Sequence, residues 1–129
     1  MDAKVILNTG VLSRANAEAF TKALDEQVQN HPQANAERIS HVLFSYYVMK
    51  EISKANKGIK VTYELGSPSK NMGVVSVVGK AMSFKDSKLF MGMVGLATNF
   101  EVYPKTDGTV QINFTFHGLE KKDGEKDGI

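Results

Sequence analysis

Cysteine and tryptophan are both absent from this chain of 129 residues. Without cysteine there is no disulfide, no thiolate nucleophile and no zinc site built on cysteine pairs. Long apolar runs are missing too, because no stretch reaches the roughly 20 apolar residues that a membrane-spanning helix needs. The first apolar run, Val5-Ile6-Leu7, is too short for a signal peptide. We therefore expect a cytoplasmic protein without a membrane partner.

The chain also has little excess of either positive or negative charge. Sixteen basic and 14 acidic residues give a formal net charge of +2, which is too small to indicate nucleic-acid binding by itself. The basic excess is local, because residues 50–105 contain nine basic and four acidic side chains. The middle of the chain is mildly basic.

The remaining composition is that of one folded domain. Hydrophobic residues make up 42% and charged residues 23% of the chain, an ordinary globular balance, and the length fits a single core. Residues 120–129 alternate Lys, Asp, Glu and Gly without an apolar period. We expect one domain over residues 1–119 and a disordered polar tail over 120–129.

Two helices are predicted in the first half. The first begins after Ser13, which can cap it, and ends near Asn30, before the break at Pro32. The second covers residues 34–57 and ends before Gly58. A strand through residues 42–49, which are rich in β-forming residues, is the alternative for part of the second segment. The first helix presents its apolar residues at helical spacing: Ala17, Phe20, Leu24 and Val28.

The second predicted helix is apolar on two opposite sides. One side carries Ile39, Val42, Leu43, Tyr46 and Met49, and the other carries Phe44, Val48, Ile52 and Ala55. A helix that is apolar on both sides must be buried on both sides. One side can pack on a sheet, but the first helix is too narrow to cover the other completely. We therefore expect a homo-oligomer with three residues of the second side in the subunit interface: Phe44, Val48 and Ile52.

Strand patterns dominate the second half. Residues 59–64 alternate as in a half-buried strand, and residues 74–78 form an apolar run typical of a central strand covered on both faces. Residues 5–7 are predicted to form a short edge strand. Residues 89–99 fit a curved strand or a short helix, and the strand is favoured. The predicted fold class is α+β, with two N-terminal helices packed on a mainly antiparallel meander.

A hairpin with a defined register is predicted near residues 99–117. A two-residue loop would place polar residues opposite apolar ones. A three-residue loop over 106–108 matches the faces instead, with Gly108 in the left-handed conformation of a G1 bulge. The matched pairs are Phe100 with Phe114 and Val102 with Ile112 on the inner face, and Tyr103 with Gln111 and Glu101 with Asn113 on the outer face.

The outer face of this hairpin is the main candidate for a binding site. Its polar side chains are Glu101, Tyr103, Gln111, Asn113 and His117. Such side chains hydrogen-bond well but carry little charge, which suits a platform for a polar ligand or partner. A plain solvated sheet face has the same pattern. If Glu101 and His117 met in one pocket, they would instead suit a small enzyme.

A second candidate is a lysine ridge formed by Lys50, Lys54, Lys57 and Lys60. Such a ridge can neutralise phosphates, so a nucleic-acid-binding module is the alternative function. A solvated lysine face gives the same sequence, because the ridge contains no arginine for bidentate contacts.

No motif in the chain requires a metal or a cofactor. The three histidines, at positions 31, 41 and 117, have no spacing that would place two on one face. His41 instead fits a hydrogen-bonded polar group on a buried helix. The segment Gly73–Lys80 resembles a phosphate loop only superficially, because five residues separate its glycines where four are needed. The sequence therefore favours a non-enzymatic binding or interaction protein over an enzyme.

Overall fold

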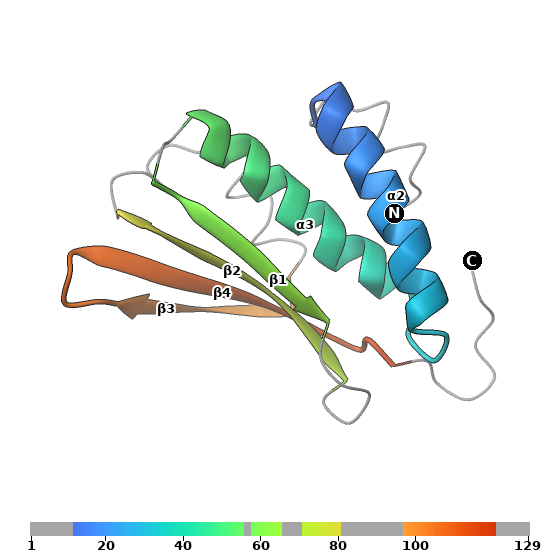
Figure 1. The fold of residues 1–129 in the computed structure, drawn as a ribbon. Helices are drawn as coiled ribbons and strands as arrows, with labels where there is room; N and C mark the ends of the chain where they lie inside the picture. The colour runs from blue at the N-terminus through green and yellow to red at the C-terminus, as the bar shows by residue number, and fades with distance from the viewer. Residues whose placement is uncertain (1–11, 56–57, 66–70, 81–96, 121–129) are drawn as a thin grey trace.

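The computed structural model describes residues 12–55, 58–65, 71–80 and 97–120. It confirms the predicted α+β class, with two helices followed by a four-stranded antiparallel sheet (Figure 1). None of the described helices combines the length and apolar character that crossing a membrane requires. The elements are α2 (Arg14–Asn30), α3 (Ala36–Ala55), β1 (Lys60–Leu65), β2 (Met72–Lys80), β3 (Asn99–Pro104) and β4 (Thr109–His117).

Both helices begin at polar caps. Ser13 caps α2 as predicted, because its Oγ accepts a hydrogen bond from the Asn16 N–H at 3.3 Å. The Oδ1 of Asn35 caps α3 by accepting from the N–H groups of Glu37 and Arg38. The chain breaks between the helices around Pro32 as predicted. The alternative of a strand over residues 42–49 is wrong, because α3 continues through them.

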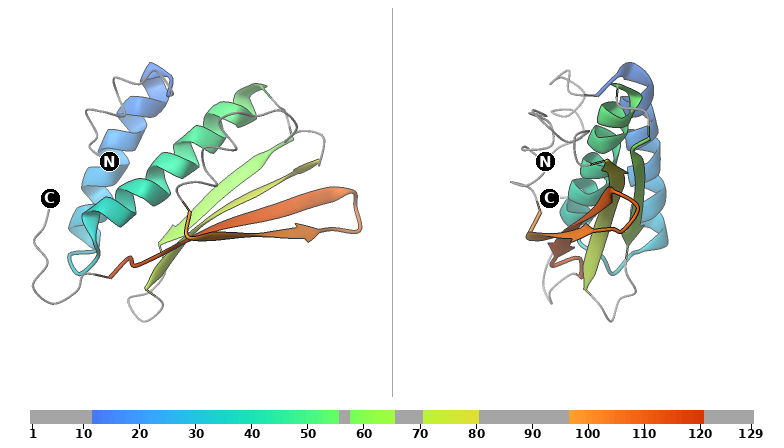
Figure 2. Two further views of the ribbon diagram at one scale, coloured as in Figure 1. Left: turned by 180° about the vertical axis from the view of Figure 1, so that it is seen from behind. Right: turned by 90° about the vertical axis from the view of Figure 1, so that its left-hand side faces the viewer.

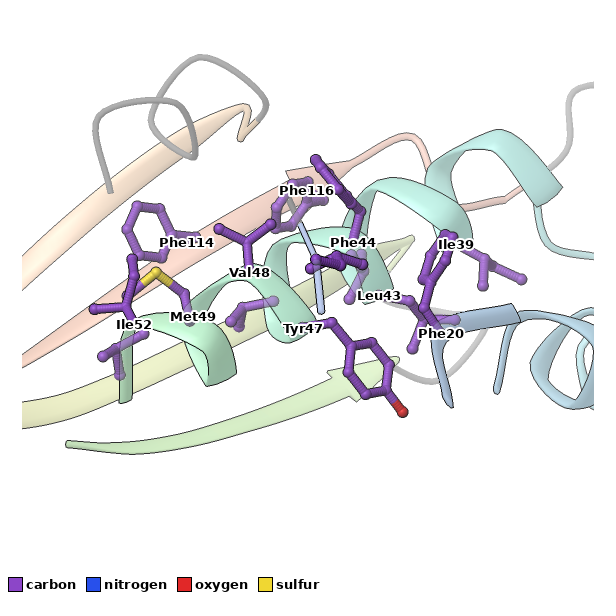
Figure 3. Close-up of a cluster of buried hydrophobic side chains, with 14 of the residues drawn as sticks. Phe20, Ile39, Leu43, Phe44, Tyr47, Val48, Met49, Ile52, Phe114 and Phe116 are labelled. Carbon is purple, nitrogen blue, oxygen red and sulfur yellow. The ribbon is translucent and has the colours of Figure 1, made fainter. Parts of the chain in front are cut away.

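The helices form successive layers on one side of the sheet. Helix α3 lies directly on the sheet, and α2 packs mainly against α3 (Figures 1 and 2). The key contact between them is Phe20, which is fully buried. Its ring meets the rings of Phe44 and Tyr47 edge-on, with centroids 6.3 Å apart in each case (Figure 3). The two sides of α3 that are apolar in the sequence are thus both buried in the structure.

The subunit interface expected on α3 required apolar side chains that one chain leaves uncovered, and the single chain covers them. Phe44, Val48 and Ile52 are at most 7% exposed within the single chain. Their burial therefore needs no second subunit. The expectation of an interface underestimated how much of this side of α3 the single chain covers. A fully buried aromatic ring such as Phe20 covers more surface than the spacing of apolar residues suggests.

The strand order is β1-β2-β4-β3. In a simple meander of the four described strands β3 would lie next to β2, whereas β4 occupies that position. Strand β2 is central as expected, but only its inner side is fully buried, at Val75 and Val77. Its other side is half-exposed, because both helices lie on the inner face. The predictions for residues 5–7 and for residues 89–96 lie outside the described residues.

The hairpin register is confirmed in every predicted pair. The N–H of Lys105 donates to the carbonyl of Thr109 at 2.9 Å, which closes a three-residue loop, and Gly108 has φ +84°. One part of the prediction is wrong: Phe114 is fully buried, but Phe100 is 46% exposed. Helix α3 packs over β1, β2 and β4, and β3 lies beyond it (Figure 1).

Glu120, the first residue of the expected polar tail, is held by the rest of the fold. Glu120 pairs with Ala34 in an isolated antiparallel bridge, and its N–H donates to the Oδ1 of Asn71. Residues 121–129 lie outside the described residues. The segment after β4 is therefore tied to the link between the helices as far as Glu120.

A buried glycine sets the distance between α3 and β2. A Cβ added at Gly73 would lie 2.8 Å from Cγ2 of Val42 and 3.5 Å from the carbonyl oxygen of Glu64. Only a residue without a side chain allows this approach.

We expect Gly73→Ala to lower the free energy of unfolding by about 1 to 3 kcal/mol, because the added methyl group overpacks the contact. The double variant Gly73→Ala with Val42→Ala should be less destabilised than the sum of the two single variants, because the shorter side chain makes room. Urea denaturation of the four proteins measures both effects. Strictly additive losses would contradict the close approach.

Glu51 fixes the start of α2 to α3. Its Oε1 accepts hydrogen bonds from the N–H of Ser13 at 2.6 Å and from Nδ2 of Asn16 at 2.8 Å, and Lys54 lies 3.6 Å away. Desolvation would raise the pKa of Glu51, but these hydrogen bonds and the lysine charge outweigh it and lower the pKa below its usual 4.5.

A carboxylate whose pKa is lowered by folding stabilises the protein fully above its unfolded pKa, and this stabilisation is lost as the pH falls through the folded value. We expect Glu51→Gln to cost about 1 kcal/mol at pH 7, since hydrogen bonds to charged groups are the stronger ones. The difference between the two proteins should shrink as the pH falls below 4.5. Denaturation at several pH values tests this, and a difference independent of pH would contradict it.

Candidate functional site

The outer face of the sheet is the side opposite the helices (Figure 2). The registers align its side chains in rows across β1, β2, β4 and β3. All five residues predicted for the polar face lie on it or at its end. The first row is Lys60, Val78, Gln111 and Tyr103, the second is Thr62, Ser76, Asn113 and Glu101, and the third is Glu64, Val74, Thr115 and Asn99.

Asn113 is the centre of the hydrogen bonding on this face. Its Oδ1 accepts from the Oγ of Ser76 at 2.8 Å and from Nε2 of Gln111 at 3.0 Å. These bonds fix the orientation of the amide and use its oxygen. Within the described part of the chain, they leave the two N–H donors of Asn113 available to a ligand. The sequence analysis missed Ser76, because it treated residues 74–78 as one buried apolar run, and the single polar residue in that run was the available signal.

Glu101 and Tyr103 form the outer rim of the same surface. Both are exposed on β3, where Glu101 lies opposite Asn113 and Tyr103 lies opposite Gln111. Opposite side chains on one face of an antiparallel pair are about 5 Å apart. The structure thus brings four of the five predicted residues into one contiguous patch.

His117 lies at the end of β4, away from this patch. Its backbone is held firmly, because its N–H donates to Oγ1 of Thr98 and its carbonyl accepts from Nε of Arg38, at 2.9 and 2.8 Å. Arg38 also donates from NH2 to Oγ1 of Thr98 at 2.9 Å. Arg38 therefore ties α3 to both strands of the hairpin. The sequence analysis did not single out Arg38, since its partners are distant in sequence.

His41 is a structural group, as the sequence suggested. Its Nδ1 is 3.1 Å from NH1 of Arg38, and its Nε2 is 3.9 Å from the carboxylate of Glu37. Burial lowers the pKa of His41, and the positive charge of Arg38 adds to this effect. The imidazole is therefore neutral near pH 7 and can accept from the guanidinium.

The structure does not bring together the two residues of the enzyme alternative. Glu101 lies opposite Asn113, and His117 is four residues further along β4. At roughly 3.3 Å per residue this is a separation of about 13 Å along the sheet, beyond hydrogen-bond reach. The alternative of a Glu101–His117 catalytic pair is therefore wrong in this fold.

The predicted lysine ridge is not one surface. Lys54 bonds Oγ of Ser13 at 3.1 Å beside α2, and Lys50 lies over the rings of Tyr46 and Tyr47, with its Nζ at 5.3 and 5.8 Å from the centroids. Lys60 is on the outer face of the sheet, on the side away from the helices. Lys57 lies outside the described residues. The ridge breaks because the turn at Gly58 carries the chain from α3 to the sheet.

An aromatic cluster on the inner side of β1 was not foreseen. The ring of Tyr46 packs at a tilt against Tyr63 of β1 and edge-on against Tyr47 of α3, at centroid distances of 4.7 and 4.9 Å. Desolvation by burial raises the pKa of Tyr47, and the neighbouring tyrosines add to this effect. These rings pack α3 against the edge strand β1, and the ammonium group of Lys50 lies over two of them.

Comparison with known protein families, with curated protein sequences and with solved structures finds no match to this chain. Among the described residues, no three His, Asp or Glu side chains are grouped as metal ligands.

The side chains that share the outer face are set by the hairpin register, and this register also pairs Phe100 with Phe114. We expect Phe114→Ala to cost about 3 to 5 kcal/mol, because it leaves a cavity under α3. Phe100→Ala should cost less than about 1 kcal/mol, since much of this ring is already in water. Thermal and urea denaturation compare the two variants. Similar losses at both positions would mean that β3 is covered to the same degree as β4.

Proposed function

We propose that this chain is a non-enzymatic binding protein whose partner docks on the outer face of the sheet. The observation that carries the proposal is the fixed amide of Asn113, whose oxygen is used by Ser76 and Gln111 while its N–H donors stay available. A donor that is already oriented loses little freedom on binding, which favours recognition.

The composition of this face favours a protein partner. Two apolar side chains, Val74 and Val78 of β2, lie half-buried on it, one on each side of the hydrogen-bonded pair Ser76 and Asn113. Around them lie hydrogen-bonding side chains from the flanking strands, among them Thr62, Gln111 and Glu101. A mixture of apolar and hydrogen-bonding side chains is usual in a protein–protein interface.

Homo-oligomerisation is part of the proposal, on grounds different from those in the sequence. The side of α3 that first suggested it is buried within the chain. The exposed large hydrophobic side chains of the described residues all lie on β3 instead: Phe100, Val102 and Tyr103. An exposed apolar strand edge is a common site of association.

Nucleic-acid binding is the weaker candidate. Lys50 and Lys54 are engaged with tyrosine rings and with Ser13 and Glu51. Phosphate binding would have to break these contacts. Lys60 is also separated from them, so these three described lysines do not form the continuous positive surface that a nucleic-acid backbone requires.

The test uses arginine substitutions and identifies the proteins that co-purify with the tagged chain from cells that encode it. Glu101→Arg and Thr115→Arg change the outer face at positions whose side chains face solvent or lie half-exposed. Glu26→Arg is the matched control, because it makes the same substitution on the exposed surface of α2. We expect the partner to be lost with both outer-face variants and retained with the control.

Two results would overturn the proposal. One is a partner that is retained equally by the outer-face variants, or no partner at all. The other is binding of a labelled single-stranded oligonucleotide that weakens steeply with salt and is abolished by Lys54→Glu, which would establish the nucleic-acid alternative instead.

A further inference from the structure

Strand β3 is an edge of the sheet with an unusual surface. It lies farthest from β1 in the strand order, and all six of its residues are exposed (Figure 1). Phe100, Val102 and Tyr103 are each 45 to 50% exposed, and they are the large hydrophobic side chains exposed in the described part of the chain. Natural edge strands are usually protected by charges or by cover. This edge carries one acidic residue, Glu101, and its side chain lies on the outer face.

Among the described residues, no strand pairs with the outer edge of β3, so its backbone is available for pairing there. The Lys105 N–H to Thr109 carbonyl bond closes the hairpin, and hydrogen-bonded positions alternate along an antiparallel ladder. Tyr103 and Glu101 therefore direct their backbone groups toward β4. Phe100, Val102 and Pro104 direct theirs away from the sheet. Proline fits this edge because the N–H that it lacks would point outward.

The outward positions are self-complementary. If two copies of β3 pair antiparallel about a two-fold axis at Val102, the N–H and carbonyl of Val102 bond those of Val102 in the second copy. Each Phe100 N–H then meets the carbonyl of Pro104, and the Phe100 carbonyl receives no bond in return, because proline has no N–H. On the outer face, each Glu101 lies opposite a Tyr103 hydroxyl, so no like charges face each other.

Two other registers of this antiparallel pairing are less favourable than the one centred on Val102. Centring the axis on Glu101 would place two carboxylates directly opposite each other, which is destabilising. Centring it on Phe100 would require an outward N–H from Thr98, which already donates to the carbonyl of Thr115 at 2.8 Å.

We propose that two copies of this chain associate through β3, with Val102 on the two-fold axis, and form one continuous sheet across the dimer. This inference rests on the homo-oligomer part of the proposed function and assigns the surface where the copies meet. The outer faces of both copies then form one larger binding face on the same side of the joined sheet, because a two-fold axis perpendicular to a sheet preserves its sides.

The absence of cysteine makes the register directly measurable, because any introduced cysteine is the chain's only thiol. We would prepare Val102→Cys, Phe100→Cys and the β1-edge control Thr62→Cys, and treat each with a thiol crosslinker that spans about 5 Å, the separation of opposite residues. We expect efficient crosslinking at position 102. Position 100 should react poorly, because its two copies are displaced by roughly 13 Å along the strands. The β1 control should not react.

Light scattering during size-exclusion chromatography gives the second measurement. We expect the unmodified chain to be a dimer at about 100 μM, a concentration that populates micromolar complexes. Val102→Lys should weaken the dimer by roughly tenfold or more, while Thr62→Lys leaves it unchanged. Val102→Pro removes only an outward N–H and should act like Val102→Lys. If the proline variant fails to fold, the lysine variant decides alone.

The possible failures are distinguishable. A chain that is monomeric at about 100 μM would overturn both the homo-oligomer and the β3 edge. A dimer that survives Val102→Lys, or that crosslinks at position 62 rather than 102, would overturn the β3 edge and leave the homo-oligomer in place. If no partner binds the outer face while the β3 dimer is intact, the proposed binding at the outer face is overturned and the β3 edge stands.

Discussion

The burial of α3 on two opposite sides is the constraint on which the rest of the structure depends. One side lies on β1, β2 and β4, and the other receives Phe20 from α2 between Phe44 and Tyr47. Apolar burial is the main favourable contribution to folding. A single helix that uses both of its sides joins two layers that would otherwise have no common core. The close approach at Gly73 on the sheet side depends on the same packing.

This central position of α3 also decides which surfaces stay open. A helix of 20 residues covers a limited width of sheet, and here it stops short of β3. With both helices on the inner side, the outer face keeps its polar rows and β3 keeps its exposed edge. The two surfaces proposed to bind partners are thus the two that the helical layers do not reach. They share the hairpin, so its register controls both.

Polar contacts hold the ends of the layers in place. Glu51 secures the start of α2 to α3, and Arg38 secures the start of α3 to the end of β4 through the carbonyl of His117 and the hydroxyl of Thr98. Both join segments that are distant in sequence. Because hydrogen bonds are directional while apolar packing is not, such contacts fix how the layers are oriented after burial has brought them together.

The sequence alone determined the features that depend on neighbouring residues. The cap at Ser13, the break at Pro32, the turn at Gly58 and the register around Gly108 follow from local backbone preferences and from matching two faces of one hairpin. Only the tertiary structure decided that β4 lies beside β2, that Phe100 is exposed, that Glu101 and His117 are apart and that the lysines are divided between two surfaces. The physical reason is that these outcomes depend on which helix or strand packs over which residues. The pattern of apolar residues in the sequence indicates which side chains must be buried, but not which element buries them, because the hydrophobic effect is non-directional.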